Sequence, residues 1–245
     1  MEQTIAVISD IHGNNLALKA VLQDITNRGI DNIFNLGDSL YGPLDPLGTY
    51  KQLIKHKMVH IMGNCDRMLL EAVDNYSQST LHHIKQMLTE EHLDWIKQHP
   101  SSVVIDDILL CHGTPDSDEA YLLEEMTEAG GTLKSSLEIM KSLQHVEQSV
   151  ILCGHSHIPR IVYLPNDKLV VNPGSVGLPA YKDDLPIPHK MESGSPYANY
   201  TIMKKEANQW LIEQINVPYD WERASKVAIQ NNRKDWAKPL MSGRA

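Results

Sequence analysis

Two histidines at the end of an apolar run are the first residues in this 245-residue chain that point to chemistry. Val150 to Cys153 predicts a buried strand, and Gly154 then lets the backbone turn sharply. His155 and His157 therefore leave the strand on one short loop. Imidazole is a common metal ligand, but two imidazoles do not complete a site, so further ligands must come from other strand ends.

Four other apolar runs also end in a side chain that can bind a metal. In chain order these side chains are Asp10 and His12, then Asp38, then Asn64, and then His112. Each of them alone is better explained as a turn residue, a helix cap or a buried histidine. Parallel strands, however, bring their carboxyl ends to one edge of a sheet, which is where α/β proteins build their sites. The joint pattern at five strand ends predicts one shared site.

The seven candidate ligands are too many for one ion. Carboxylate, imidazole and amide groups together suit Mn, Fe or Zn better than Ca or Mg, which prefer oxygen ligands alone. Two ions about 3.5–4 Å apart that share one carboxylate would use all seven, and the centrally placed Asp38 is the natural bridge. We predict two divalent ions, with Mn favoured and Fe, Zn or Ni as alternatives. Such a pair would bind a phosphoryl oxygen and lower the pKa of a bridging water.

The spacing of apolar side chains predicts the elements that hold these residues. Helical spacing over residues 16–25, between strands at 3–9 and 33–36, predicts a βαβ unit with parallel strands. The other expectations are a mostly helical stretch over 67–99, a helix over 132–143, a surface loop over 179–196, hairpins over 103–110, 161–171 and 200–215, and a helix over 221–231. This order predicts an α/β fold with two sheets packed face to face and helices outside. We expect one domain over residues 1–245, with a motif core over 4–178 and a C-terminal hairpin and helix over 197–231.

The composition of the chain argues against some classes of binding partner. A net charge of -9 and an isoelectric point near 5.7 argue against attraction to long nucleic acids. The longest apolar stretches are far shorter than the roughly 20 residues that cross a bilayer, and the N-terminus carries no signal-peptide pattern. We expect a cytoplasmic protein without a membrane partner. The oligomeric state is left open, and a homodimer is compatible with the sequence.

The ordered motifs resemble those of calcineurin-like metallophosphoesterases, in particular the small bacterial and archaeal single-domain branch. The matching segments are Asp10-Ile11-His12, Gly37-Asp38, Gly63-Asn64, His112-Gly113 and Gly154-His155-Ser156-His157. The resemblance implies a four-layer αββα sandwich with two mixed sheets. It implies one ion on Asp10, His12, Asp38 and His157, and a second on Asp38, Asn64, His112 and His155. It also implies that a hydroxide between the ions is the nucleophile.

Cys65 departs from the family pattern. Many members carry a histidine at this position, where it protonates the leaving group. A thiol is a poorer proton donor in this role, so the departure affects the choice of leaving group. We expect catalytic roles for Asp38, Asn64, Cys65 and His112, and substrate contacts from Asn64 and Arg160. A solvated surface role explains Arg160 and the neighbouring Arg67 equally well.

The sequence therefore predicts a phosphoesterase that hydrolyses a small phosphodiester or phosphomonoester, including nucleotide-derived ones. The alternative is a catalytically silent scaffold on the same fold that binds protein partners. A scaffold would be expected to lose ligands, whereas here only the acid histidine differs. A nuclease for long polymers is disfavoured because no basic stripe is present.

Overall fold

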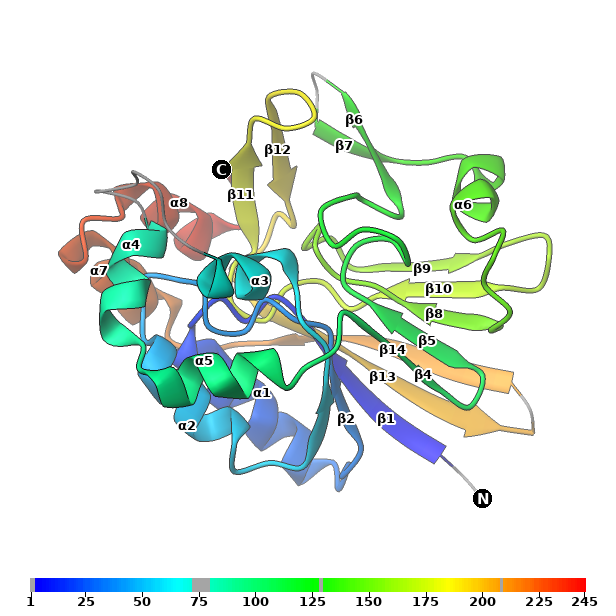
Figure 1. Ribbon diagram of the computed structural model, residues 1–245, viewed down its shortest axis with the longest axis horizontal. Coiled ribbons are helices and arrows are strands. Elements are labelled where there is room, and N and C mark those ends of the chain that lie inside the picture. Colours follow the sequence, from blue (N-terminus) through cyan, green and yellow to red (C-terminus); the bar gives the residue numbers. More distant parts are fainter. Residues whose placement is uncertain (1–2, 72–79, 128–129, 208) are drawn as a thin grey trace.

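Two five-stranded sheets pack face to face, with helices on their outer sides (Figure 1). The computed structural model describes residues 3–71, 80–127, 130–207 and 209–245. The first sheet has the order β14-β13-β1-β2-β3, with β14 Gln209–Val217, β13 Ala198–Glu206, β1 Gln3–Ile8, β2 Ile33–Asn35 and β3 Met58–His60. The second has the order β4-β5-β8-β10-β9, with β4 Ser102–Ile105, β5 Ile108–Cys111, β8 Val150–Leu152, β10 Leu169–Asn172 and β9 Arg160–Tyr163.

Both sheets are mixed, and each contains three neighbouring parallel strands. β1, β2 and β3 run parallel in the first sheet, as do β5, β8 and β10 in the second. The outer strands pair antiparallel with them. Because parallel neighbours end at the same edge, the loops after these strands gather at one place.

Alternating side chains of the central strands fill two layers of core. In β1, Ile5 and Val7 face the second sheet and meet Leu110 and Val171. Ala6 and Ile8 face the other way, toward the helices. Burial on both faces explains why these strands are continuous apolar runs in the sequence. The α/β prediction with two mixed sheets and outer helices is thus confirmed.

The helices cover both outer faces of the pair of sheets. Next to the first sheet lie α1 Asn15–Asn27, α2 Pro46–Leu53, α3 Asn64–Leu70, α4 Thr80–Met87 and α5 Glu90–Lys97 (Figure 1). Ile139 of α6, Ser136–Ser142, packs on the far face of the second sheet. The predicted helical stretch over 67–99 is confirmed where it is described, and residues 72–79 lie outside the described residues. Within the described ranges, no helix is both long and apolar enough to cross a membrane.

Two expectations from the sequence were wrong. The region 179–196 is not a loop throughout, because β11 Ala180–Asp183 and β12 His189–Glu192 form an antiparallel hairpin in it. Two of its four prolines, Pro186 and Pro188, lie between the two strands, and the charged residues of the strands make the buried side chains of Ala180 and Met191 hard to recognise in the sequence. The helix expected over 132–143 begins only at Ser136, since Ser135 caps it and the preceding residues pair in the hairpin of β6 Glu124–Thr127 and β7 Gly130–Leu133.

The C-terminal segment folds into two packed helices. α7, Trp221–Gln230, agrees with the helix predicted over 221–231. The next helix, α8 Lys234–Ser242, was not expected, because Pro239 in its middle interrupts the helical pattern. Trp236 and Leu240 of α8 pack with Ala224 and Ala228 of α7. α8 also contacts β11, so it is fixed from two sides.

Leu240→Ala is expected to lower the free energy of unfolding by about 2–5 kcal/mol, because it removes a fully buried side chain from this contact. Urea unfolding followed by circular dichroism measures the change. Met241→Ala is the matched control, since Met241 is 43% exposed and its truncation should change stability by less than about 0.5 kcal/mol. Equal losses in the two variants would contradict this packing of α8.

Candidate metal centre

The loops after five strands bring all seven predicted ligands together. His157 Nε2 lies 3.3 Å from Asp10 Oδ1, and His112 Nε2 lies 3.5 Å from Asp38 Oδ2. Asn64, the first residue of α3, places its Oδ1 3.0 Å from His112 Nε2. Within the described residues, three groups have ligand atoms within 4.8 Å of one another: Asp10, His12 and His157; Asp10, Asp38 and His112; and His12, Asp38 and Cys65. His155 joins none of these groups, but its ring is 5.2 Å from that of His112.

Most of these residues adopt a backbone conformation that L-amino acids avoid. Positive φ angles between 50° and 66° occur at Asp10, His12, Asp38, His155 and His157. Such angles are uncommon outside glycine and persist only where the surroundings impose them. Here hydrogen bonds between the loops do so, for example from the Asp10 amide to the Gly37 carbonyl at 3.0 Å. The strand-end loops are thus held in one conformation by each other.

Two glycines allow the loops to approach this closely. A Cβ at Gly63 would collide with Asp38 Oδ1, and a Cβ at Gly154 would collide with Ser9 Oγ. Both glycines lie next to predicted ligands, so their small size is what keeps the carboxylates and imidazoles in contact range.

A backbone carbonyl fixes the tautomer of each candidate imidazole. Nδ1 of His12, His112 and His157 lies 2.6–2.9 Å from the carbonyls of Tyr41, Leu36 and Leu178, respectively. For His155 the bonded nitrogen is Nε2, 2.9 Å from the Glu119 carbonyl. A carbonyl oxygen only accepts, so the bonded nitrogen must carry the hydrogen. In a neutral ring the remaining lone pair therefore lies on Nε2 of His12, His112 and His157 and on Nδ1 of His155, which is how metal-binding histidines are oriented.

These fixed lone pairs fit a bound cation. Nε2 of His12 and Nε2 of His157 lie 3.1 Å apart, although both Nδ1 atoms already hold the hydrogen of the neutral ring. Asp10 Oδ1 is buried and has no hydrogen-bond partner among the described residues. Facing lone pairs beside an unpaired carboxylate oxygen are costly unless a positive charge lies between them. The mixed oxygen and nitrogen donors suit divalent transition-metal ions.

The buried carboxylates dominate the electrostatics of the centre. Burial alone would raise the pKa of Asp38, but His112 and the other neighbouring imidazoles together hold that pKa well below its usual range. Burial likewise opposes charge on His112, yet the Asp38 carboxylate raises its pKa to about 10. Burial and the neighbouring His112 lower the pKa of His155 to about 4, so that imidazole keeps a free lone pair at neutral pH. The site favours positive charge next to Asp38.

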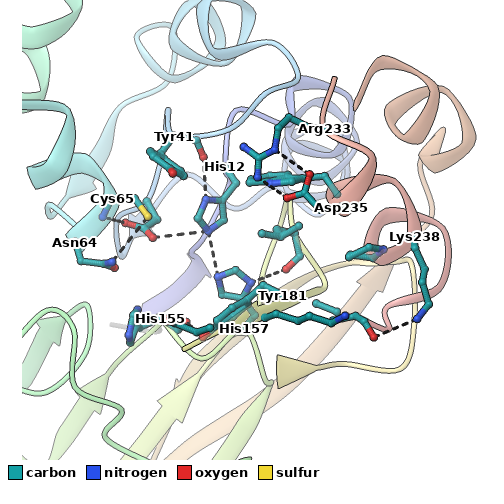
Figure 2. Close-up of a pocket in the computed structure, with 18 of the residues that line it drawn as sticks. His12, Tyr41, Asn64, Cys65, His155, His157, Tyr181, Arg233, Asp235 and Lys238 are labelled. Atoms are coloured by element: carbon teal, nitrogen blue, oxygen red, sulfur yellow. Dashed lines mark hydrogen bonds and ion pairs between the residues drawn. The ribbon is translucent and has the colours of Figure 1, made fainter. Parts of the chain in front are cut away.

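A cavity of about 520 Å³ opens over this centre (Figure 2). Five predicted ligands line it: His12, Asp38, Asn64, His155 and His157. Sequence analysis missed another part of the cavity wall, which is formed by Tyr181 of β11 and by Arg233, Trp236 and Lys238 at α8. The run Arg233-Lys234-Asp235-Trp236, three charged residues beside an aromatic, was the only sequence feature that could have drawn attention to it.

Cys65 also lines the cavity. Its amide donates to Asp38 Oδ1 at 2.9 Å, and its sulfur lies 3.8 Å from the Asn64 side-chain nitrogen. Burial, together with the nearby Asp38 carboxylate, raises the pKa of the thiol well above its ordinary value. The sulfur is therefore protonated at neutral pH.

The two arginines near the motifs are occupied by carboxylates. Arg160 donates from Nε to Glu124 Oε1 at 2.8 Å and is not among the described residues that line the cavity. Arg67 of α3 donates to both carboxylate oxygens of Asp118 and to Glu119 Oε1, at 2.7–3.2 Å. Arg67 thereby ties the helix that carries Asn64 to the loop whose Glu119 carbonyl orients His155.

The profile of the calcineurin-like phosphoesterase superfamily domain matches residues 4–187. The chain belongs to this superfamily. Its members are phosphoesterases, which implies hydrolysis of phosphoric esters with a divalent metal cofactor, and the ligand groups above are where such a cofactor would bind.

Three known proteins show the similarity of this chain in sequence or in structure. An uncharacterized protein of Methanocaldococcus jannaschii is 28% identical to this chain. The alignment is 263 positions long and covers 96% of each chain. A metallophosphoesterase from Sphaerobacter thermophilus superposes with a TM-score of 0.78 at 20% identity, over 98% of this chain and 100% of that one. A hypothetical protein from Pyrococcus horikoshii gives a TM-score of 0.73 at 18% identity, over 98% of each chain. The likeness to the two solved structures confirms the fold.

Arg67→Ala is expected to weaken binding of one metal ion about 10–100-fold, because the loop that orients His155 loses its anchor. Isothermal titration with Mn and elemental analysis of the purified variant measure this. Arg28→Ala is the control, since it removes an exposed arginine–carboxylate pair from α1's C-terminus without touching the site. A folded Arg67→Ala protein with unchanged metal affinity would rule out this role for Arg67.

Proposed function

We propose that this protein is a dinuclear metal-dependent phosphoesterase that hydrolyses small phosphodiesters or phosphomonoesters, including nucleotide-derived ones. The observation that carries the proposal is the set of fixed imidazole lone pairs around Asp10 and Asp38 at the base of the cavity. A complete ligand set of this kind has no use in a scaffold that only binds proteins. Hydrolysis of small esters at this site also requires no basic channel of the kind that binds a long nucleic acid.

The residues divide into two ligand sets that share Asp38. Asp10, His12 and His157 form one set, and their ligand atoms already lie within 4.8 Å of one another. Asn64, His112 and His155 form the other. Two divalent ions, with Mn as the favoured metal, would neutralise phosphoryl charge and activate a water. The protein contributes fixed ligand directions, so little rearrangement is needed when charge develops in the transition state.

Asn64 and Cys65 are the residues best placed to act on the substrate. Asn64 presents Oδ1 toward His112, which leaves its side-chain NH₂ to donate to a phosphoryl oxygen. Cys65 holds a protonated thiol in the cavity wall and is the candidate proton donor to the leaving group. Arg160 would have to leave Glu124 before it could contact a substrate, so its expected role is the weaker part of the proposal.

A turnover assay tests the function directly. Purified protein is analysed for metal and then incubated with p-nitrophenyl phosphate and bis-p-nitrophenyl phosphate in the presence of Mn. Release of p-nitrophenol that is abolished by a chelator and restored by Mn is expected. A protein that binds no metal and turns over neither ester would instead support the scaffold.

Asp38→Asn is expected to lower kcat at least about 10²-fold and to reduce total bound metal, because Asp38 serves both ions. Asp106→Asn is a closely matched control. Both residues are aspartates with a positive φ, 55° and 52°, which asparagine also tolerates, but Asp106 lies in the exposed β4–β5 turn. Full turnover by Asp38→Asn with two ions bound would refute the shared-ligand assignment.

Cys65→His is expected to raise kcat/KM selectively for esters with a poor leaving group, since imidazole is the better proton donor and general-acid help is worth roughly 10²–10⁴-fold. Esters of p-nitrophenol scarcely need protonation and should gain much less. The measurement compares p-nitrophenyl and alkyl esters in wild type, Cys65→His and Cys65→Ala. A uniform loss across leaving groups in Cys65→His would mean that Cys65 is only a packing residue.

A further inference from the structure

The cavity wall on the side of β11 and α8 concentrates positive charge. Four cationic side chains line it, which we call the basic wall: Lys182, Arg233, Lys234 and Lys238. Outside the metal centre, three acidic groups among the described residues line the same cavity: the side chains of Asp183 and Asp235 and the main-chain carboxylate of Ala245. The chain as a whole has a net charge of -9, so this balance is the reverse of its average surface. Figure 2 shows Arg233 and Lys238 on the side of the cavity away from Asn64 and Cys65.

Arg233 is held in place before any ligand arrives. Its Nε and Nη2 donate to the two carboxylate oxygens of Asp235 at 2.9 and 2.5 Å. Its guanidinium also lies 5.4 Å from the centre of the Trp236 ring. Nη1 has no hydrogen-bond partner within the described part of the chain. A planar guanidinium fixed in this way loses little side-chain entropy when it binds an anion.

Trp236 sets the distance between the basic wall and the metal centre. Its ring is buried and meets the His12 ring edge-on, with 5.9 Å between the ring centres. Because the guanidinium of Arg233 is 5.4 Å from the same ring, it lies at most about 11 Å from the His12 imidazole. A small organic molecule can bridge that distance.

Lys238 adds a second fixed cation. Its Nζ donates to a main-chain carboxylate oxygen of Ala245 at 3.1 Å, which occupies one of its three N–H groups. The helix that carries both residues is docked by the buried Leu240 and by its contact with β11. The basic wall is therefore a built part of the cavity.

We infer that the basic wall binds a second anionic group of the substrate while the metal centre holds the reacting phosphoryl group. The substrate class is then a phosphate ester whose leaving group carries a further phosphate, as in nucleoside bisphosphates. This inference rests on the proposed phosphoesterase function for the position of the reacting group. It adds that Arg233 and Lys238 select substrates with two separated anions over those with one.

Binding of two stable phosphonates tests this without turnover. Hexylphosphonate and hexane-1,6-diphosphonate share the same chain but carry one and two anionic ends, and neither has a bond that a phosphoesterase cleaves. Isothermal titration of the Mn-loaded wild type is expected to give at least about tenfold tighter binding of the diphosphonate, a gain typical of charge-assisted hydrogen bonds. The double variant Arg233→Gln/Lys238→Gln should lose most of that preference.

Two further variants of the protein complete the experiment, one as a control and one as a second test of the basic wall. Lys226→Gln removes the same kind of charge from a side chain on α7 that is 73% exposed, and it should retain the wild-type preference. Lys234→Gln changes an exposed residue of the basic wall and should lower the preference in the same direction even if the double variant fails to fold. Equal affinity of wild type for the two phosphonates, or an unchanged preference in the folded double variant and in Lys234→Gln, would overturn the inference.

An incorrect inference about the basic wall and an incorrect proposed function would give different results. Turnover of bis-p-nitrophenyl phosphate without a preference for the diphosphonate would overturn only the inference about the basic wall. If the protein hydrolyses no ester but prefers the diphosphonate, and the double variant loses this preference, the role of the basic wall would be supported and the proposed phosphoesterase function refuted.

Discussion

The burial of two carboxylates is the constraint on which this structure depends. Asp10 and Asp38 are almost completely shielded from water, and an unpaired charge in such a place is very costly. Four imidazoles surround them, and each imidazole is tied on its outer side to a backbone carbonyl. In the neutral form of each ring, the inner nitrogen consequently carries a lone pair. Carboxylates and lone pairs together can be stabilised only by positive charge, which is why the centre is best understood as a site for cations.

The loops that satisfy this constraint come from both sheets. The carbonyls that orient the rings belong to Leu36, Tyr41, Glu119 and Leu178, which are spread over the chain from residue 36 to residue 178. The positive φ angles at the ligands are stable only while these loops are packed together. The ligand geometry is therefore a property of the sandwich as a whole, and isolated strand-end segments would not reproduce it.

Much of this centre could be predicted from the sequence, because its chemistry lies directly after apolar runs. Asp10, Asp38 and His112 follow strands buried on both faces, and such runs are easy to recognise. Which ring nitrogen faces inward could not be predicted, since that depends on distant carbonyls. The wall around Arg233 and Trp236 was missed because Pro239 interrupts the helix there and charged residues mask β11. The extent of the domain and the roles of individual ligands stay predictions.

The order of these parts along the chain has an evolutionary consequence. Every candidate ligand lies before residue 158, whereas the basic wall is built entirely after residue 179. The two short segments that carry the basic wall, β11 and α8 with the preceding Arg233, could thus diverge while the ligand loops and the strands β13 and β14 remained under constraint. A lineage built this way could acquire new specificities by drift in these two segments, with its chemical step inherited unchanged.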